Sequence, residues 1–214
     1  MDEKSRVREI LACLDAYYGS ETRVSLDHEN AWELLVATIL SAQCTDARVN
    51  MVTPDLFSKY PDVNAMAEAD LEDLEKLIHS VGFYHAKAKN LILCARKIRD
   101  DFGGEVPSTI EELTSLTGVG RKTANVIRGN IYDDPSIVVD THVKRISKKL
   151  GLTSNTEPEK VEIDLMNVLP KDHWIRWNIQ LITLGREICI ARRPKCQECP
   201  LSHVCPSRHL EDGQ

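Results

Sequence analysis

The sequence lacks the features that mark membrane, secreted and nucleic-acid-coating proteins. No apolar run approaches the ~20 residues that a membrane-spanning helix needs, and the N-terminus does not resemble a signal peptide. A net charge of −6 argues against a protein that coats nucleic acid indiscriminately. We therefore expect a cytoplasmic protein.

Strands long enough to build a sheet, low-complexity linkers and internal repeats are also missing. Only Ile137–Val139 resembles a strand, and it is too short to build a sheet. Elsewhere apolar residues recur at helical spacing, as in 32–43 and 69–80, and Ser108 and Glu111 have the spacing of a capping box before a further helix. A chain of 214 residues can bury a good core, in one large domain or two small ones. The pattern predicts an all-α fold with a soft boundary at the turn-forming stretch 132–135.

The seven cysteines are distributed unevenly along the chain. Four of them lie close together near the C-terminus with the spacing C-x6-C-x2-C-x5-C: Cys189, Cys196, Cys199 and Cys205. Thiolates gathered in this way suit a metal that prefers soft ligands, either tetrahedral zinc or an iron–sulfur cluster. Four unrelated buried cysteines are the alternative, and disulfides are less expected because nothing else indicates secretion. The remaining three, Cys13, Cys44 and Cys94, read as small buried hydrophobic residues.

A glycine pair marks a second site. Gly118, Val119 and Gly120 join two helical segments, with Val119 able to pack inward. Paired glycines permit a tight turn with positive φ, and the helix that follows begins with free N–H groups and the positive end of its dipole. Such a turn binds a phosphate without reading sequence, and Arg121 and Lys122 follow directly.

The charge distribution supports a polyanionic ligand. Residues 118–151 hold seven Lys/Arg against three Asp, and residues 186–208 hold five against two Glu. Two basic stretches beside the candidate sites fit an enzyme that grips a polyanion on one face, whereas solvated helix faces are the alternative. Asp140 follows the apolar Ile137–Val139 and is expected to be the N-cap of the next helix, where its carboxylate would be held rigidly.

Together these motifs resemble the endonuclease III family of helix-hairpin-helix DNA glycosylases. The resemblance is carried by the hairpin (LTGVGRKTA, 116–124), by LSAQCTD (40–46), by VDTHV (139–143) and by the four-cysteine loop, and it covers roughly 25–205. It implies a [4Fe-4S] cluster on the four cysteines, which the spacing alone does not distinguish from zinc. It also implies two lobes, a six-helix bundle of 22–133 that carries the hairpin and a cluster domain of 1–21 with 134–214, with the active-site cleft between them.

The resemblance implies a reaction for two of these residues. Lys122 would be the amine that attacks C1′, expels the base and forms a Schiff base, and Asp140 the essential carboxylate. Arg121 and the helix N-terminus both favour the neutral amine that attack requires. The expected activity is that of a bifunctional glycosylase and abasic-site lyase of base excision repair, acting on oxidised or ring-saturated pyrimidines such as thymine glycol. A glycosylase for thymine or uracil opposite guanine, a non-catalytic iron–sulfur DNA-binding protein and a zinc-stabilised protein are the alternatives.

The resemblance also implies a binding partner and DNA-contacting roles for other residues. The partner would be double-stranded DNA that contains damaged bases or abasic sites, bound by a monomer at the nucleoid of a prokaryote. Gln43 matches the residue that fills the space left by the flipped nucleotide, and Phe83 is either an aromatic wedge or a core aromatic. Phosphate contacts are expected from residues 118–121 and from Arg192, Arg193 and Lys195 in the cysteine loop.

Three further positions are harder to interpret. Asp46 and His142 are expected to line the lesion pocket, with caps or surface groups as the alternative. Thr117 occupies a position where the family usually has proline, so the turn loses some preset rigidity, but its glycines remain and phosphate binding is expected to survive.

Overall fold

The computed structural model describes residues 2–20 and 24–208, and every element of regular structure in these ranges is a helix. The all-α prediction is confirmed, and Ile137–Val139 forms no strand. None of the described helices is both long enough and apolar enough to cross a membrane. The chain divides into two compact units. We name them the hairpin unit, Val24–Asp134, and the cysteine unit, which contains the described residues 2–20 and 135–208.

The helices of the hairpin unit are α2 (Ala31–Ser41), α3 (Asp46–Lys59), α4 (Val63–Ala67), α5 (Leu71–Ile78), α6 (Tyr84–Phe102), α7 (Ile110–Ser115) and α8 (Arg121–Ile131). Short polar side chains begin most of them, as when Asn30 and Asp70 each accept a hydrogen bond from a backbone N–H three residues on. The capping box of α7 lies one residue later than predicted. Thr109, not Ser108, takes the extended N-cap conformation, and its Oγ1 accepts from the N–H of Glu112 at 3.2 Å.

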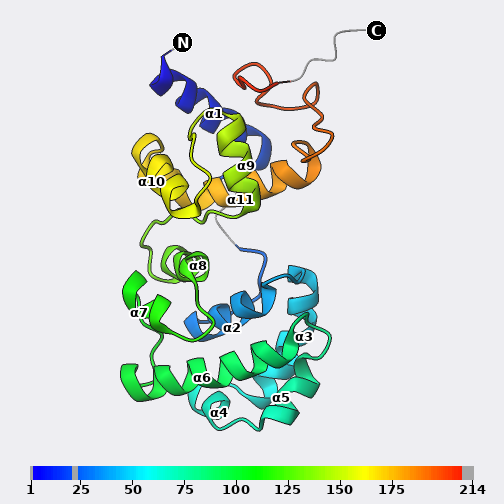
Figure 1. Ribbon diagram of the computed structural model, residues 1–214, viewed down its shortest axis with the longest axis vertical. Coiled ribbons are helices and arrows are strands. Elements are labelled where there is room, and N and C mark those ends of the chain that lie inside the picture. The colour runs from blue at the N-terminus through cyan, green and yellow to red at the C-terminus, as the bar shows by residue number, and fades with distance from the viewer. Residues whose placement is uncertain (1, 21–23, 209–214) are drawn as a thin grey trace. The chain divides into compact units, whose positions relative to one another are not determined.

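The core of the hairpin unit is built around α2. Apart from Glu33, its residues from Trp32 to Leu40 are buried, and α3, α6 and α8 all pack against it. A helix that is covered on every side must be apolar on every side, which explains the near-continuous apolar run in this segment. α4 and α5 pack along the long helix α6 (Figure 1).

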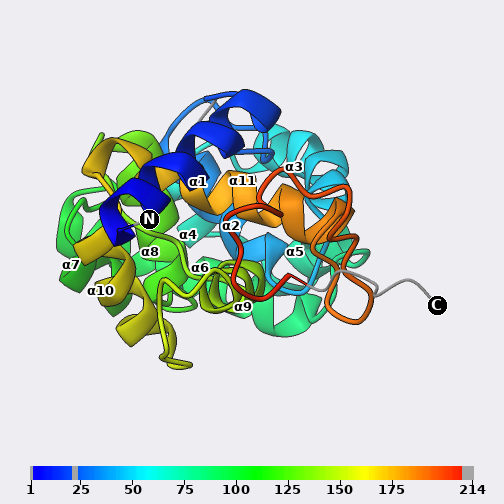
Figure 2. The same ribbon diagram turned by 90° about the horizontal axis from the view of Figure 1, so that it is seen from above.

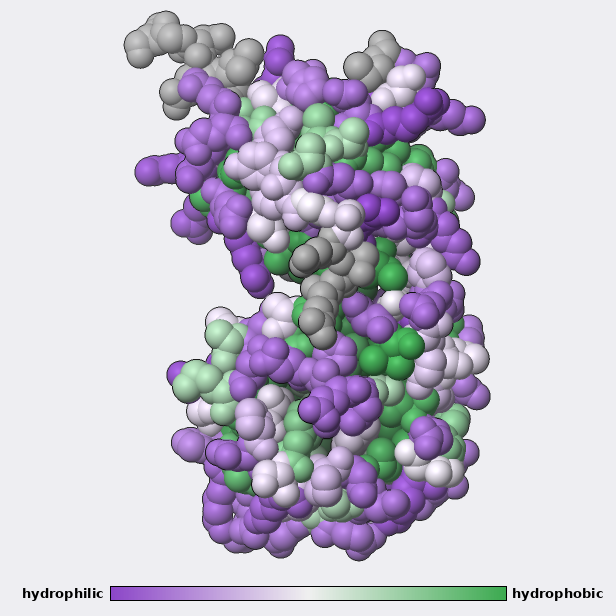
Figure 3. All heavy atoms as spheres, turned by 180° about the vertical axis from the view of Figure 1, so that it is seen from behind, coloured by the Kyte–Doolittle hydropathy of each residue, from purple (hydrophilic) through white to green (hydrophobic). Residues whose placement is uncertain are grey.

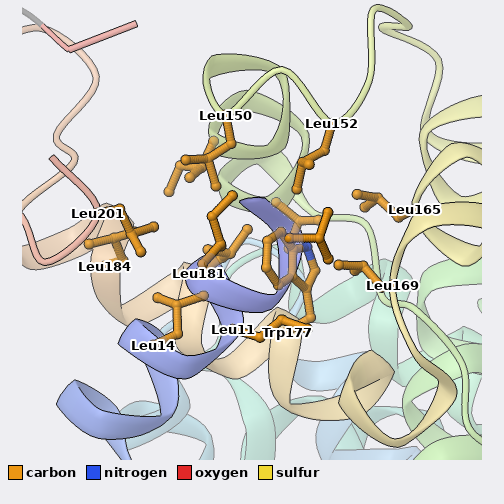
Figure 4. Packing of buried hydrophobic residues seen from close by; sticks show 14 of the residues in the cluster. Leu11, Leu14, Leu150, Leu152, Leu165, Leu169, Trp177, Leu181, Leu184 and Leu201 are labelled. Carbon is orange, nitrogen blue, oxygen red and sulfur yellow. The ribbon is translucent and has the colours of Figure 1, made fainter. Parts of the chain in front are cut away.

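The helices of the cysteine unit are α1 (Glu3–Tyr18), α9 (Thr141–Lys149), α10 (Pro158–Val168), a short 3₁₀ helix (Lys171–His173) and α11 (Trp174–Glu187). Their apolar faces share one core, in which the fully buried Trp177 is surrounded by leucines from several elements (Figure 4). Leu11 and Leu14 come from near the start of the chain, and Leu201 comes from near its end. Two segments that are far apart in the sequence therefore share the core of this unit.

The last part of the cysteine unit, 188–208, has turns but no helix, and we call it the cysteine loop. It is drawn as an irregular orange-to-red trace in Figure 2. Backbone hydrogen bonds from Cys189 N to Leu184 O (2.7 Å) and from Lys195 N to Ile188 O (2.9 Å) fold its first turn back on the end of α11. Hydrophilic side chains cover most of the visible face of each unit, with only scattered apolar patches (Figure 3).

Candidate active site and metal centre

The hairpin turn between α7 and α8 depends on one glycine for its shape. Gly118 has φ +81°, a backbone conformation that favours glycine, and a Cβ added there would lie only 3.1 Å from Cβ of Asn90 on α6. Gly120 has φ −92° and open space around it, so its conformation is available to any residue. Val119 is 6% exposed and packs inward, as predicted.

The turn closes without the usual proline. Val119 N donates to the Leu116 carbonyl at 3.2 Å, so a backbone hydrogen bond holds the turn next to Thr117. Gly120 is the N-cap of α8 and offers no side chain to cap the first N–H groups of the helix. The positive end of this helix is therefore open to an anion.

Lys122 is the second residue of α8, directly after this turn. Its side chain is exposed in the first turn of the helix, as is that of Arg121. An exposed amine beside a helix N-terminus can reach a ligand whose phosphate the turn holds. The geometry within the hairpin unit is thus suited to a nucleophile that acts next to a bound phosphate.

Asp140 is the N-cap of α9 in the cysteine unit, as predicted. Its Oδ1 accepts a hydrogen bond from Val143 N at 2.8 Å, and buried Ile137 and Val138 precede it. Within the described part of the chain, this cap engages only one of the two carboxylate oxygens. The carboxylate is half-buried and held by the cap, an arrangement that would suit stabilisation of a developing positive charge.

The two predicted pocket residues have local structural partners. Asp46 is in the first turn of α3 and accepts a hydrogen bond from Ser25 Oγ at 2.5 Å, while Thr45 caps the helix. The ring of His142 on α9 packs against Gly185 on α11, where any Cβ would overlap it. Nδ1 of His142 is buried and has no hydrogen-bond partner among the described residues. Their role in a lesion pocket stays a prediction.

Two exposed loop tips meet in the hairpin unit. Gln43 follows α2 with φ +55°, and Phe83 precedes α6 with φ +58° and a 67% exposed side chain. A Cβ added at Gly82 would lie 3.5 Å from the Gln43 carbonyl, so the loops touch through their backbones. The core alternative for Phe83 is wrong. Its exposed ring and left-handed backbone conformation make Phe83 a candidate for contact with a ligand.

Lys87 is a candidate residue that sequence reasoning missed. Only 6% of it is exposed, and its Nζ donates to the carbonyls of Leu40 (2.8 Å) and Ala42 (2.6 Å) at the end of α2. Burial lowers the pKa of this amine. The ammonium group satisfies carbonyls that the helix end leaves unpaired, and so it fixes the loop that carries Gln43. The available signal was a lysine at a buried helical position, next to Ala88 and in step with Leu91.

All four C-terminal cysteines line a single cavity in the cysteine loop, together with Lys149, Ile188 and Lys195. Burial raises the pKa of Cys199 to about 11, with smaller contributions from the neighbouring cysteines, and burial also raises the pKa of Cys205. Four thiolates in this space would repel one another unless a cationic group bound them. The donor set therefore fits a metal centre that takes four soft ligands, and no protein ligand position is left over for a substrate.

Cations surround this centre and continue along the loop. Nη1 of Arg145 lies 3.6 Å from Sγ of Cys189, which would offset negative charge on a ligated sulfur. Arg192, Arg193 and Lys195 are all exposed in the stretch between the first two cysteines. Cys94 is fully buried, as expected of a small hydrophobic residue, whereas Cys13 and Cys44 are only partly buried.

Comparison with known proteins places this geometry among DNA repair enzymes. Residues 36–171 match the model of the HhH-GPD superfamily base excision DNA repair proteins, and 189–205 match that of the iron–sulfur binding domain of endonuclease III. The endonuclease III of a Synechocystis strain is 52% identical, with 96% of this chain and 94% of the relative covered. That of Bacillus subtilis is 44% identical over 96% and 95%.

Solved structures give the same result. A non-covalent endonuclease III–DNA complex superposes with a TM-score of 0.89 at 41% identity, covering 97% of both chains. A trapped endonuclease III–DNA covalent intermediate gives 0.86, also at 41% identity and 97% coverage. A thermostable thymine-DNA glycosylase shares the fold, with a TM-score of 0.85 at 20% identity. The match at 189–205 decides between the two metal groups in favour of iron–sulfur.

Proposed function

This chain belongs to the endonuclease III family of base excision DNA repair proteins, which makes it a bifunctional DNA glycosylase and abasic-site lyase, and we propose that Lys122 and Asp140 carry its chemistry. The single observation that supports Lys122 most strongly is its exposed position in the first turn of α8, directly after the Gly118 turn. The related protein trapped covalently on DNA, 41% identical to this chain, is consistent with an amine nucleophile.

The proposed reaction has two steps. The neutral Nζ of Lys122 attacks C1′ of the flipped nucleotide, the bond to the base breaks, and the base leaves with the electron pair and takes up a proton. The C1′–O4′ bond then breaks as a proton passes from the nitrogen to O4′, which opens the sugar ring and leaves a protonated Schiff base at C1′. Loss of a C2′ proton breaks the bond from C3′ to the phosphate oxygen, which nicks the strand. Asp140 stabilises the positive charge on the sugar during the first step.

We assign DNA binding mainly to contacts with the phosphates. The N-terminus of α8 with residues 118–121 would hold one phosphate, and Arg192, Arg193 and Lys195 would hold others. Cys189, Cys196, Cys199 and Cys205 would hold the [4Fe-4S] cluster. When bound, the cluster supplies the cross-link that folds the cysteine loop and presents these cations. Binding should weaken steeply with salt and depend little on base sequence.

The flipped nucleotide requires a pocket and something to replace it in the duplex. Gln43 would enter the vacated space and Phe83 would act as a wedge beside it. We assign oxidised or ring-saturated pyrimidines as the substrate, with Asp46 and His142 as candidate lining residues. We assign Lys122 to a lobe of 22–133 and Asp140 to a lobe of 1–21 with 134–214. We place the protein in the cytoplasm of a prokaryote, at its nucleoid.

Borohydride trapping tests this proposal. The protein is reduced on a duplex with thymine glycol and on one with an abasic site, alongside the variants Lys122→Gln and Lys89→Gln. Lys89 is exposed on α6 and serves as the control for loss of a surface amine. We expect a covalent adduct with both duplexes that Lys122→Gln alone abolishes.

Each other outcome identifies a different error. Trapping on the abasic duplex alone keeps the lyase but moves the substrate to mismatched thymine or uracil. Strand cleavage by Lys122→Gln at the unmodified protein's rate would exclude this lysine as the nucleophile.

A further inference from the structure

Three metal-ligating side chains outside the four-cysteine cavity converge in the cysteine unit. Glu9 and Cys13 are one turn apart on α1, and His203 is in the cysteine loop. Oε1 of Glu9 is 3.9 Å from Sγ of Cys13 and 3.2 Å from Nε2 of His203, and all three ligand atoms lie within 4.8 Å of one another. We propose that Glu9, Cys13 and His203 form a second metal site, one that binds a single Zn²⁺ ion and links α1 to the cysteine loop.

The chemistry of the donor set favours zinc. A thiolate, an imidazole and a carboxylate are the three side-chain ligand types that zinc takes in proteins, and a soft thiolate disfavours Mg²⁺ and Ca²⁺. Tetrahedral bonds of about 2.0–2.3 Å place ligand atoms roughly 3.3–3.8 Å apart. Two of the separations above already fall close to that range. Water would complete the fourth position, because Glu9 and His203 are about half-exposed, with 47% and 55% of their side chains accessible.

The backbone segments that carry the three ligands are anchored by buried neighbouring residues. Ile10 and Leu14, which flank the ligands on α1, are fully buried. Leu201 and Val204, on either side of His203, enter the same core and are 1% and 7% exposed. Ligands on supports that are already ordered lose little conformational entropy on binding an ion.

A hydrogen-bonded cluster without metal is the competing interpretation. The carboxylate of Glu9 can accept from the Cys13 thiol and from the His203 ring, which satisfies all three groups at the surface. That interpretation explains the contacts but does not require a thiol at position 13, because a serine hydroxyl could donate the same hydrogen bond. Zinc binding and a hydrogen-bonded cluster therefore differ in what they require of Cys13.

The site is separate from the [4Fe-4S] ligands but lies on the same loop. His203 falls between Cys199 and Cys205, two of the four cluster ligands. Zinc at this site would tie the last turn of the cluster-binding segment to α1. We expect occupancy to slow the loss of iron from the protein, because the loop must open for the cluster to leave.

The experiment titrates cluster-loaded protein with ZnCl₂ by calorimetry and measures iron and zinc in the same samples. We expect one equivalent of zinc to bind with iron retained, and Cys13→Ser and His203→Gln each to weaken binding at least about tenfold. Cys44→Ser, which changes the other partly buried free cysteine, should bind zinc like the unmodified protein. No stoichiometric binding, binding that neither variant weakens, or binding matched by loss of iron would overturn the proposal.

A second measurement uses the unmodified protein and does not depend on the folding of any variant. Alkylation of Cys13 by iodoacetamide is followed by mass spectrometry with and without one equivalent of ZnCl₂. The site predicts at least about tenfold slower alkylation of Cys13 with zinc, and no change at Cys44, because a ligated thiolate is shielded from the reagent. Equal rates at Cys13 under both conditions would show that zinc does not bind this thiol.

Discussion

The two units reach a stable fold by different routes. The hairpin unit is one continuous segment whose helices follow each other closely, with polar caps of their own and the apolar helix α2 at the centre. The cysteine unit joins α1 to helices more than a hundred residues later in the chain, and the cysteine loop contributes no helix. The first unit is held by helix caps and by packing within one continuous segment, and the second by contacts between two separate segments of the chain and by a metal centre.

Polar contacts show the same contrast. In the hairpin unit the buried amine of Lys87 donates to two carbonyls at the end of α2. In the cysteine unit Asp15 of α1 accepts from Gln180 at 2.8 Å and from Arg176 at 3.2 Å, both on α11. These hydrogen bonds join residues that are 165 and 161 positions apart in the sequence. We therefore expect the cysteine unit to lose more stability than the hairpin unit when one long-range contact is removed.

Removing one ligand of the metal centre should have a large effect on the cysteine unit and little effect on the hairpin unit. Cys199→Ser is expected to lose the cluster and, with it, the order of the cysteine loop, because metal binding supplies folding free energy. Hydrogen exchange should show lost protection in the cysteine loop and α11, with α2 to α8 retaining theirs, and DNA affinity should fall. A soluble, cluster-free protein with unchanged DNA affinity would contradict the structural role of the centre.

Lys87 offers the sharpest test within the hairpin unit. Lys87→Met leaves the carbonyls of Leu40 and Ala42 without their donor, at a cost of about 1–3 kcal/mol in the free energy of unfolding. A loosened Gln43 loop should slow excision of a damaged base by roughly ten- to a hundredfold. Strand cleavage at a preformed abasic site should change much less, since no base remains to be removed.

Single-turnover rates on the two duplexes measure this difference, with Lys89→Met, an exposed lysine on the same helix, as the control. Equal losses on both duplexes would mean that Lys87 acts only through general stability, not through the loop.

Close packing in the cysteine unit should be sensitive to a single methyl group. Gly185→Ala places a Cβ against the His142 ring and should lower the free energy of unfolding by about 1–3 kcal/mol. The cost should shrink when the ring is removed first, so Gly185→Ala in a His142→Ala background serves as the control. Hydrogen exchange in peptides of α9 and α11 measures both effects. An equal cost in both backgrounds would assign the loss to another contact.

The smallest expected effect is a gain in the hairpin unit. Leu116 already has φ −75° and ψ 142°, the extended conformation that a following proline requires. Thr117→Pro should therefore raise the free energy of unfolding by about 0.4–1 kcal/mol through a less flexible unfolded chain. Chemical denaturation and borohydride trapping should show a higher midpoint and an unchanged adduct. A loss of stability would show that the native turn does not accommodate the ring.

Local features of the fold were predictable from the sequence. Helical periodicity, the N-caps at Asp70 and Asp140 and the Gly118 turn depend on residues within a few positions of each other. The grouping of the four cysteines is also local, because a few turns of chain are enough to bring them around one cavity. The one-residue error at the α7 cap, Thr109 for Ser108, shows the limit even there, since either residue can cap a helix.

The local sequence did not predict the burial of two side chains at the start of α6, which the tertiary structure sets. Phe83 is apolar yet exposed, and Lys87 is charged yet buried, because the path of the chain before α6 and the end of α2 set their surroundings. The packing of His142 on Gly185 and the meeting of Glu9, Cys13 and His203 join segments far apart in the sequence. Spacing along a chain reports neighbours within a turn or two, whereas burial and ligand geometry depend on which distant helices share a core.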